Sequence, residues 1–401
     1  MNNTPNANRK HIALYGKRNV GKSSLINSII GQDISLVSDV KGTTTDPVSK
    51  SMELIPLGPV VFIDTAGLDD KGTLGEMRVE RTLKILERTD FAIYVMDIND
   101  IDKEAYEQTV RSFKKFNIPY ITVINKIDTV NEEELQKIKN GFEDAVYVSA
   151  NNMNSILELK DVLIERIKEE DDDPPIIGDI LPYNSKVIMV VPIDSEAPKG
   201  RIILPQVQLI RDCLDNGIKS YVVRDTELKE ALNDIKDVDL VVTDSQAFKK
   251  VSKIVPSHIK LTSFSILFAR HKGDLNVFLE GISKIKELDE NSKILISESC
   301  THNVSHEDIG RVKIPRMLSK LIGKKLDFEF KMGHDFPKDI EKYDLIIHCA
   351  SCMLNRKTMQ TRIQMCREKG VSITNYGVIL AYLTGILDRS VEIFETIQKH
   401  M

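Results

Sequence analysis

A short apolar segment, residues 10 to 15, leads directly into the glycine-rich stretch Gly16-Lys17-Arg18-Asn19-Val20-Gly21-Lys22-Ser23. This is the P-loop pattern, in which a strand enters a phosphate-binding turn and a helix follows, here from Ser24. Backbone N–H groups of such a turn bind phosphate oxygens, Lys22 adds a positive charge, and the Ser23 hydroxyl can ligate magnesium. The stretch therefore predicts an α/β domain built around a nucleotide. The expected phosphate-site residues are Gly16, Asn19, Val20, Gly21, Lys22, Ser23 and Ser24.

Four further motifs follow in the order that a small GTPase requires: Gly42-Thr43-Thr44-Thr45-Asp46, Asp64-Thr65-Ala66-Gly67, Asn125-Lys126-Ile127-Asp128 and Ser149-Ala150. Asp64 ends an apolar run and can hold a magnesium-bound water, while the Gly67 N–H can meet the γ-phosphate. Thr44 would close over the metal from a mobile loop. We therefore expect Lys22, Thr44 and Gly67 to carry the hydrolysis of the nucleotide, with magnesium held by Ser23 and Thr44.

The base of the nucleotide is predicted from the third motif. The carboxylate of Asp128 can accept hydrogen bonds from both N–H groups on the edge of guanine, and adenine presents the wrong pattern. GTP is therefore favoured over ATP, and the expected base-site residues are Asn125, Lys126, Asp128, Ser149 and Ala150.

The N-terminal segment resembles the GTPases of the family that includes the tRNA-modification GTPase and Era. Leu68 stands where Ras-like enzymes keep a water-orienting glutamine, so the hydrolytic machinery must differ. In potassium-dependent members of that family a P-loop asparagine ligates K⁺, and Asn19 matches that position. The resemblance thus implies K⁺ stimulation, whereas the plainer alternative is that Asn19 only shapes the loop.

Composition limits the class of protein. The 401 residues exceed one compact core and fit two or three domains, and a net charge of -5 gives the chain as a whole no reason to seek nucleic acid. Residues 1 to 10 are polar and lack the core of a signal peptide, and no stretch is long and apolar enough to cross a membrane. We expect a cytoplasmic protein whose five cysteines stay reduced, with Cys213 and Cys366 buried in the core.

An acidic and proline-containing run, residues 169 to 175, indicates a linker after the GTPase domain. Beyond it, apolar runs alternate with helical patterns, which predicts parallel α/β sheets. We predict an α/β protein of three consecutive domains: a GTP-binding domain (1–172), a linker (173–180), a small dimerisation domain (181–268) and a metal-binding domain (269–401). The uncovered edge of a four-stranded sheet would make the homodimer; the alternative is a spacer buried within one chain.

Two fragments of the last domain carry soft-metal ligands: Cys300-Thr301-His302 and His348-Cys349-Ala350-Ser351-Cys352. Each follows an apolar strand, and neighbouring parallel strands bring their end loops together at one edge of a sheet. Thiolates and imidazoles suit zinc or an iron-sulfur cluster. A structural zinc is the main alternative, and a redox dithiol of Cys349 and Cys352 would leave Cys300 and the histidines unexplained.

Taken over the whole chain, this order of motifs resembles the iron-iron hydrogenase maturation GTPases, the HydF family. The resemblance implies that Cys300, Cys349 and Cys352 hold a 4Fe-4S cluster whose fourth iron has a replaceable ligand, with His302 and His348 as candidates. It implies a scaffold that assembles or delivers a di-iron precursor, with two radical maturation enzymes and the apo-hydrogenase as partners. The alternative function is a K⁺-stimulated regulatory GTPase of ribosome or tRNA with a C-terminal structural zinc site.

Overall fold

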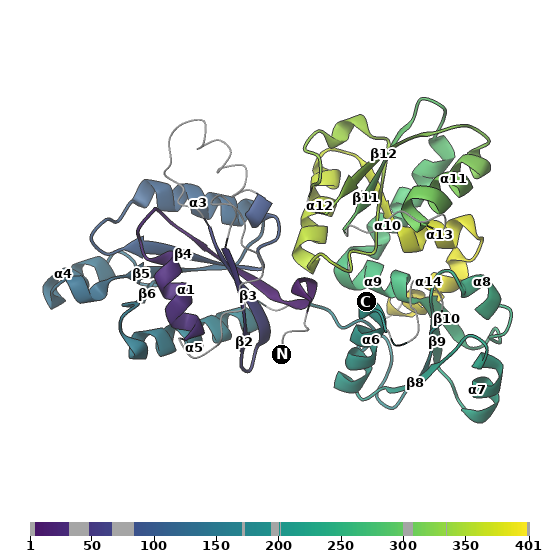
Figure 1. Ribbon diagram of the computed structural model, residues 1–401, viewed down its shortest axis with the longest axis horizontal. Helices are drawn as coiled ribbons and strands as arrows, with labels where there is room; N and C mark the ends of the chain where they lie inside the picture. Colours follow the sequence, from purple (N-terminus) through teal and green to yellow (C-terminus); the bar gives the residue numbers. More distant parts are fainter. Residues whose placement is uncertain are drawn as a thin grey trace. The chain divides into compact units, whose positions relative to one another are not determined.

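The computed structural model describes residues 5–31, 48–65, 84–170, 173–193, 200, 202–299, 308–333 and 335–398. It divides the chain into two compact units, Met1–Asp172 and Asp173–Met401 (Figure 1). Within the described ranges, no helix combines the length and the apolar character that crossing a bilayer requires.

The first unit is a six-stranded sheet with the order β2-β3-β1-β4-β5-β6, parallel except for the pair β2 and β3. Its strands are β1 (Lys10–Tyr15), β2 (Val48–Leu54), β3 (Gly58–Asp64), β4 (Phe91–Asp97), β5 (Tyr120–Asn125) and β6 (Val146–Tyr147). Its helices are η1 (Asn6–Asn8), α1 (Lys22–Ile30), α3 (Lys103–Lys115), η2 (Ile127–Thr129), α4 (Glu132–Lys139) and α5 (Met153–Glu169).

Alternation along the central strand β1 explains why helices cover both faces of this sheet. Ile12 and Leu14 point into a core formed with α1 and α5, whereas Ala13 and Tyr15 point into a second core formed with α3 and α4. Side-chain caps begin the outer helices: Asp102 accepts from the Ala105 N–H (3.1 Å) at α3. The parallel sheet thus places the loops after β1, β3 and β5 at one edge.

The second unit contains two four-stranded sheets, in the orders β10-β9-β7-β8 and β12-β11-β13-β14, and all their strand pairs are parallel. The first sheet is made of β7 (Lys186–Val190), β8 (Lys219–Val223), β9 (Leu240–Thr243) and β10 (Lys260–Ser263). The second is made of β11 (Lys293–Glu298), β12 (Asp327–Met332), β13 (Leu345–His348) and β14 (Ser372–Asn375). The predicted α/β class, with a P-loop domain followed by parallel sheets, is confirmed.

Helices connect these strands as the βαβ pattern requires. The helices of the sheet that contains β7 to β10 are α6 (Leu204–Asp215), α7 (Leu228–Asp234), α8 (Phe248–Val251) and α9 (Phe264–Lys272). Those around the second are α10 (Leu275–Ser283), η3 (Lys284–Glu287), η4 (Ile309–Lys313), α11 (Ile314–Ile322), η5 (Ile340–Lys342), α12 (Arg356–Glu368), α13 (Tyr376–Leu383) and α14 (Leu387–Gln398).

The C-terminal helix α14 returns to the first of these two sheets. The hydroxyl of Thr262 on β10 donates to the carbonyl of Ser390 (2.8 Å), Lys260 pairs with Glu392 (2.6 Å), and Ile393 is buried in the core of that sheet. The two sheets of the second unit therefore share a helix, and the chain ends on the sheet where the unit begins.

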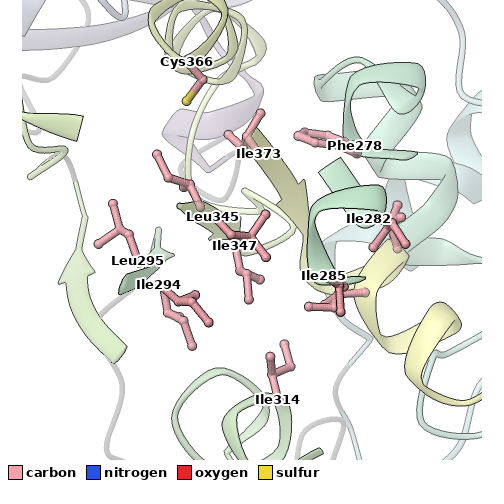
Figure 2. Close-up of a cluster of buried hydrophobic side chains, with 14 of the residues drawn as sticks. Phe278, Ile282, Ile285, Ile294, Leu295, Ile314, Leu345, Ile347, Cys366 and Ile373 are labelled. Atoms are coloured by element: carbon pink, nitrogen blue, oxygen red, sulfur yellow. The ribbon is translucent and has the colours of Figure 1, made fainter. Parts of the chain in front are cut away.

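The core of the second sheet is aliphatic (Figure 2). Ile294 and Leu295 on β11, Leu345 and Ile347 on β13 and Ile373 on β14 are all buried, and Phe278 and Ile282 of α10 belong to the same cluster. Cys366 on α12 is also part of this core, and Cys213 is buried in the core of the first sheet, as predicted. Burial raises the pKa of both thiols to about 12, so neither is a reactive thiolate.

Candidate functional site

The P-loop has the backbone geometry that its glycines allow. Gly16 and Gly21 have φ values of 140° and 94°, which residues with a side chain rarely adopt. A Cβ on Gly16 would lie 2.2 Å from the Val95 carbonyl oxygen, and one on Gly21 would lie 2.3 Å from Nδ2 of Asn125. The loop is therefore packed against β4 and the base motif so closely that only glycine fits.

Lys22 begins α1 and is only 7% exposed. Its ammonium donates to the carbonyl oxygens of Gly16 (3.0 Å) and Lys17 (2.7 Å), so the charge lies inside the turn of the P-loop. Val20 is buried beneath the loop, whereas Asn19, Ser23 and Ser24 are exposed. The arrangement presents backbone N–H groups and one fixed cation, which is what a nucleotide phosphate requires.

Ser23, an expected magnesium ligand, meets Asp64, which is expected to hold a magnesium-bound water. Ser23 at the start of α1 donates its hydroxyl to the carboxylate of Asp64, which ends β3. A hydroxyl beside a carboxylate is an oxygen pair that fits magnesium, because Mg²⁺ prefers hard oxygen ligands and keeps several waters. Thr44, Gly67 and Leu68 lie outside the described residues.

The guanine motif is bonded to the P-loop. Asn125 donates from Nδ2 to the Val20 carbonyl (2.9 Å) and accepts at Oδ1 from the Ala150 N–H (3.2 Å). Lys126 donates to the Asn19 carbonyl (2.9 Å) and to Asp97 (2.5 Å). The base and phosphate motifs are thus one hydrogen-bonded assembly.

Three further residues complete this region. Asp128 lies in η2 with its side chain exposed, and Ser149 is 2% exposed, with its N–H donating to the Ser155 hydroxyl (3.1 Å). Asn19 has a φ of 63°, a left-handed conformation that asparagine tolerates better than most residues. The structure therefore brings together the described members of the predicted GTP site.

The candidate metal centre lies where two adjacent strands of the second sheet end. The β13 strand ends at His348, and its neighbour β11 ends at Glu298. The N–H of Cys349 donates to the Ser297 carbonyl (2.9 Å), which extends the pairing past the strand end. Cys300 and His302 follow β11 in the sequence but lie outside the described residues, as do His306 and His334. The topology thus brings the ends of the two strands that precede the predicted fragments to one sheet edge.

Cys349 is held by Ser299. The Ser299 N–H donates to the Cys349 sulfur (3.0 Å), and the Ser299 hydroxyl lies 2.9 Å from the same sulfur. Burial raises the pKa of Cys349, and the hydrogen bonds from Ser299 act in the opposite direction. Hydrogen bonds of this kind to a thiolate are typical of iron-sulfur sites.

His348 is fully buried and both of its ring nitrogens are hydrogen-bonded. Arg362 on α12 donates to Nε2 (2.6 Å), and Nδ1 lies 2.9 Å from the Cys349 carbonyl, which fixes the proton on Nδ1. Burial and then the charge of Arg362 lower the pKa of His348 to about 3. The His348 imidazole is therefore neutral, and its hydrogen bonds support the cysteine loop.

The Cys349–Cys352 loop is also held by a lysine from α9. The ammonium of Lys272 donates to the carbonyl oxygens of Ser351 (3.0 Å) and Leu354 (2.9 Å). Cys352 is partly exposed. Burial lowers the pKa of Lys272 to about 8, while the charges of Cys352, Cys349 and Asp173 act to raise it. A buried cation bonded to the loop that carries Cys349 and Cys352 fits a site for an anionic metal-thiolate group.

The described residues alone do not complete a metal site. In the ranges that the structure covers, no group of three His, Cys, Asp or Glu side chains is placed to hold a metal ion. The described thiols Cys213, Cys349, Cys352 and Cys366 form no disulfide with one another. The predicted role of Cys300 as a metal ligand stays a prediction, because this residue lies outside the described ranges.

Sequence reasoning missed Ser299, Lys272 and Arg362. Arg362 is 3% exposed and Lys272 is likewise 3% exposed, although both types are seldom buried. Ser299 had a signal, since it directly precedes Cys300 at the end of a predicted strand. Lys272 and Arg362 had no such signal, because their positions in the sequence do not indicate that they contact the cysteine loop.

Family models match three successive parts of the chain. Residues 11–126 match the 50S ribosome-binding GTPase model, residues 176–273 match the hydrogen maturase F dimerization domain, and residues 276–393 match the hydrogen maturase F tetramerization domain. The last two together span more than half of the chain.

Curated relatives share a smaller part. GTPase Der of Kosmotoga olearia is 38% identical over 141 residues, which are 34% of this chain and 32% of that protein. The tRNA modification GTPase MnmE of Mesoplasma florum is 35% identical over 148 residues, 37% of this chain and 32% of that protein. The chain thus spans about a third of the length of these relatives.

Among solved structures, a point variant of Aquifex aeolicus Era bound to GDP·AlF4⁻ has 19% sequence identity and a TM-score of 0.32, with 62% of this chain and 98% of that chain covered. With a GTPase domain followed by both hydrogen maturase F domains in the order of that architecture, the chain belongs to the HydF family of hydrogenase maturases.

Proposed function

We propose that this protein is a GTPase that also serves as a 4Fe-4S scaffold and carrier, and that it assembles or delivers the di-iron precursor during maturation of iron-iron hydrogenase. The family supports the maturation role, and the GTPase domain supports GTP binding with magnesium. The observation that carries the scaffold role is the Cys349–Cys352 loop, bonded through Ser299 at the sheet edge where the Cys300 segment begins.

In this proposal Cys300, Cys349 and Cys352 hold the cluster. When bound, the cluster supplies an iron whose fourth ligand can be replaced by an incoming fragment. Ser299 stabilises the thiolate of Cys349, and Arg362 keeps His348 neutral and oriented. Because both nitrogens of His348 are engaged, we assign this histidine to support of the loop. His302 remains the histidine that we propose as a candidate for the fourth position.

On the nucleotide side, we propose that Lys22 neutralises charge on the phosphates while Ser23 and Asp64 hold magnesium and its water. Thr44 and Gly67 would close on the γ-phosphate, and Asp128 would select guanine. We further propose that K⁺ binds at Asn19 and speeds hydrolysis. Equal hydrolysis rates in K⁺ and Na⁺ buffers would remove this part of the proposal.

The proposed assembly is a homodimer formed through the sheet that contains β7 to β10. The dimerization and tetramerization domains indicate that the protein oligomerises. We propose the β8 edge as the dimer contact, because β10 at the other edge is bonded to α14 whereas Val222 on β8 is 49% exposed. The other proposed partners are two radical maturation enzymes and the apo-hydrogenase, in a reducing cytoplasm.

A transfer assay tests this function. The protein would be co-expressed with the two radical enzymes, purified without oxygen and mixed with apo-hydrogenase, and hydrogen evolution would be measured. We expect activation by the wild-type protein and none by the Cys349→Ser variant prepared in the same way. A wild-type protein that binds GTP and iron but never activates the apo-hydrogenase would contradict the carrier role.

A further inference from the structure

Lys272 is a buried cation that belongs to one domain and contacts a loop of the next. It is the last residue of α9, within the segment that matches the dimerization domain, and it is 3% exposed. Its ammonium donates to Ser351 and Leu354, which lie in the segment that matches the tetramerization domain. The two carbonyls flank Cys352, so the lysine clamps the part of the loop that carries this thiol.

The position of Lys272 is fixed by its surroundings. The Gln360 amide of α12 donates to the Gly273 carbonyl (2.9 Å), and Arg356 of the same helix donates to the His271 carbonyl. The Ser263 hydroxyl caps the other end of α9 by accepting from the Ile266 N–H (3.3 Å). The residues on either side of Lys272 are thus tied to α12, and the side chain has little freedom to leave the loop.

Burial of an ammonium is costly unless charge and hydrogen bonds compensate for it. Two carbonyls compensate only part of the cost, because a lysine has three donors and one full charge. The Ser351 carbonyl that accepts from Lys272 lies between Cys349 and Cys352 in the loop, so the ammonium is placed beside the segment that carries both thiols. The environment therefore suits a cation whose partner is the negative charge of the two cysteines in their thiolate form.

We propose that Lys272 is a positioning residue of the cluster site: it holds the Cys349–Cys352 loop through two carbonyls and offsets the negative charge of a metal-thiolate group. The site is then built by both HydF domains together, within one compact unit. This inference rests on the proposed cluster-binding function, although the clamp itself does not.

Three variants of the full-length chain separate the two roles of Lys272. Lys272→Met removes the charge and both hydrogen bonds, whereas Lys272→Gln removes the charge and keeps a donor. Lys284→Met is the matched control, because Lys284 pairs with Glu287 at the surface of the same unit. Circular dichroism and cooperative thermal unfolding show that each variant is folded.

The first readout uses protein without metal. Hydrogen exchange of the amides in residues 350–354 should be about tenfold faster in Lys272→Met than in the wild type, because the charge-assisted bonds are lost. Lys272→Gln should fall between the two, and Lys284→Met should match the wild type. Unchanged exchange in a folded Lys272→Met protein would overturn the clamp, whether or not the wild type binds iron.

The second readout is the reduction potential of the reconstituted cluster, followed by electron paramagnetic resonance. Loss of a nearby cation disfavours the reduced, more negative cluster, so both Lys272 variants should have a lower potential than the wild type and Lys284→Met. Equal potentials would overturn the charge role. A wild type that takes up no iron would instead refute the proposed function. If neither Lys272 variant folds, Lys272 serves folding alone and the proposal is wrong.

Discussion

The P-loop and the Cys349–Cys352 loop both follow the carboxyl end of a buried parallel strand, but they are built in different ways. In the P-loop, the charge of Lys22 is held by carbonyls five and six residues before it, although the loop is also bonded to the guanine motif. The cysteine loop depends on Ser299, Lys272 and Arg362, which are contributed by three other elements. The contrast shows that neighbouring residues can hold the cation of the phosphate site, whereas the cation bonded to the cysteine loop comes from a distant element.

The largest effect should come from Lys22→Ala. This change removes the only side-chain cation that lies inside the turn among the described P-loop residues, so GTP hydrolysis should fall by about 100-fold or more. Phosphate release measures the rate. Iron content after anaerobic reconstitution should equal that of the wild type. A parallel loss of iron would show that the two regions are not independent.

Cys349→Ser should give the reverse result. Serine cannot replace the thiolate whose sulfur is bonded to Ser299, so most of the iron should be lost while GTP hydrolysis is unchanged. Cys366→Ala is the control, because Cys366 is a buried core thiol on α12 and should not affect the iron content. Iron retained by Cys349→Ser would remove Cys349 from the proposed ligands.

Arg362→Met tests how far the cysteine loop depends on distant residues. The variant loses the donors to His348 and to the Gly333 carbonyl, and we expect thermal or denaturant unfolding to show a loss of about 2–3 kcal/mol in stability. Arg367→Met removes an exposed arginine of the same helix and should change stability by less than about 0.5 kcal/mol. Similar losses in both variants would mean that burial of Arg362 has no special role.

The smallest effect concerns the backbone of the P-loop. Gly21→Ala and Gly31→Ala both place a side chain at a positive φ, but only the first meets an atom, Nδ2 of Asn125. We expect Gly21→Ala to weaken GTP binding by about tenfold, as measured by calorimetry, and Gly31→Ala to leave the affinity unchanged. Equal affinities would show that the loop adjusts without cost to the nucleotide.

The difference between the P-loop and the Cys349–Cys352 loop also explains which features of the fold and of the sites could be predicted from the sequence. The alternation of apolar runs with helical patterns beyond the linker correctly predicts the parallel sheets of the second unit, because apolar runs and turns are local signals. The guanine and phosphate motifs were likewise found from spacing alone. The predicted roles of Thr44, Gly67, Cys300 and His302 stay predictions, since these residues lie outside the described ranges.

Contacts between distant segments could not be predicted. The return of α14 to β10 depends on Thr262 meeting the Ser390 carbonyl, more than 100 residues later in the chain. The buried positions of Lys272 and Arg362 have the same cause, because a single sequence carries no mark of which lysine or arginine the fold will enclose. In the sequence, His348 next to Cys349 is indistinguishable from a metal ligand. Only its hydrogen bonds in the structure indicate a supporting role.

The most direct test of a GTPase that carries a 4Fe-4S scaffold is the metal content of protein reconstituted without oxygen, measured together with electron paramagnetic resonance. The account predicts about four irons and four sulfides per chain and a signal from the reduced cluster that shifts when imidazole is added. Stoichiometric zinc that iron cannot displace, with no such signal, would contradict it and would favour a regulatory GTPase with a structural zinc site.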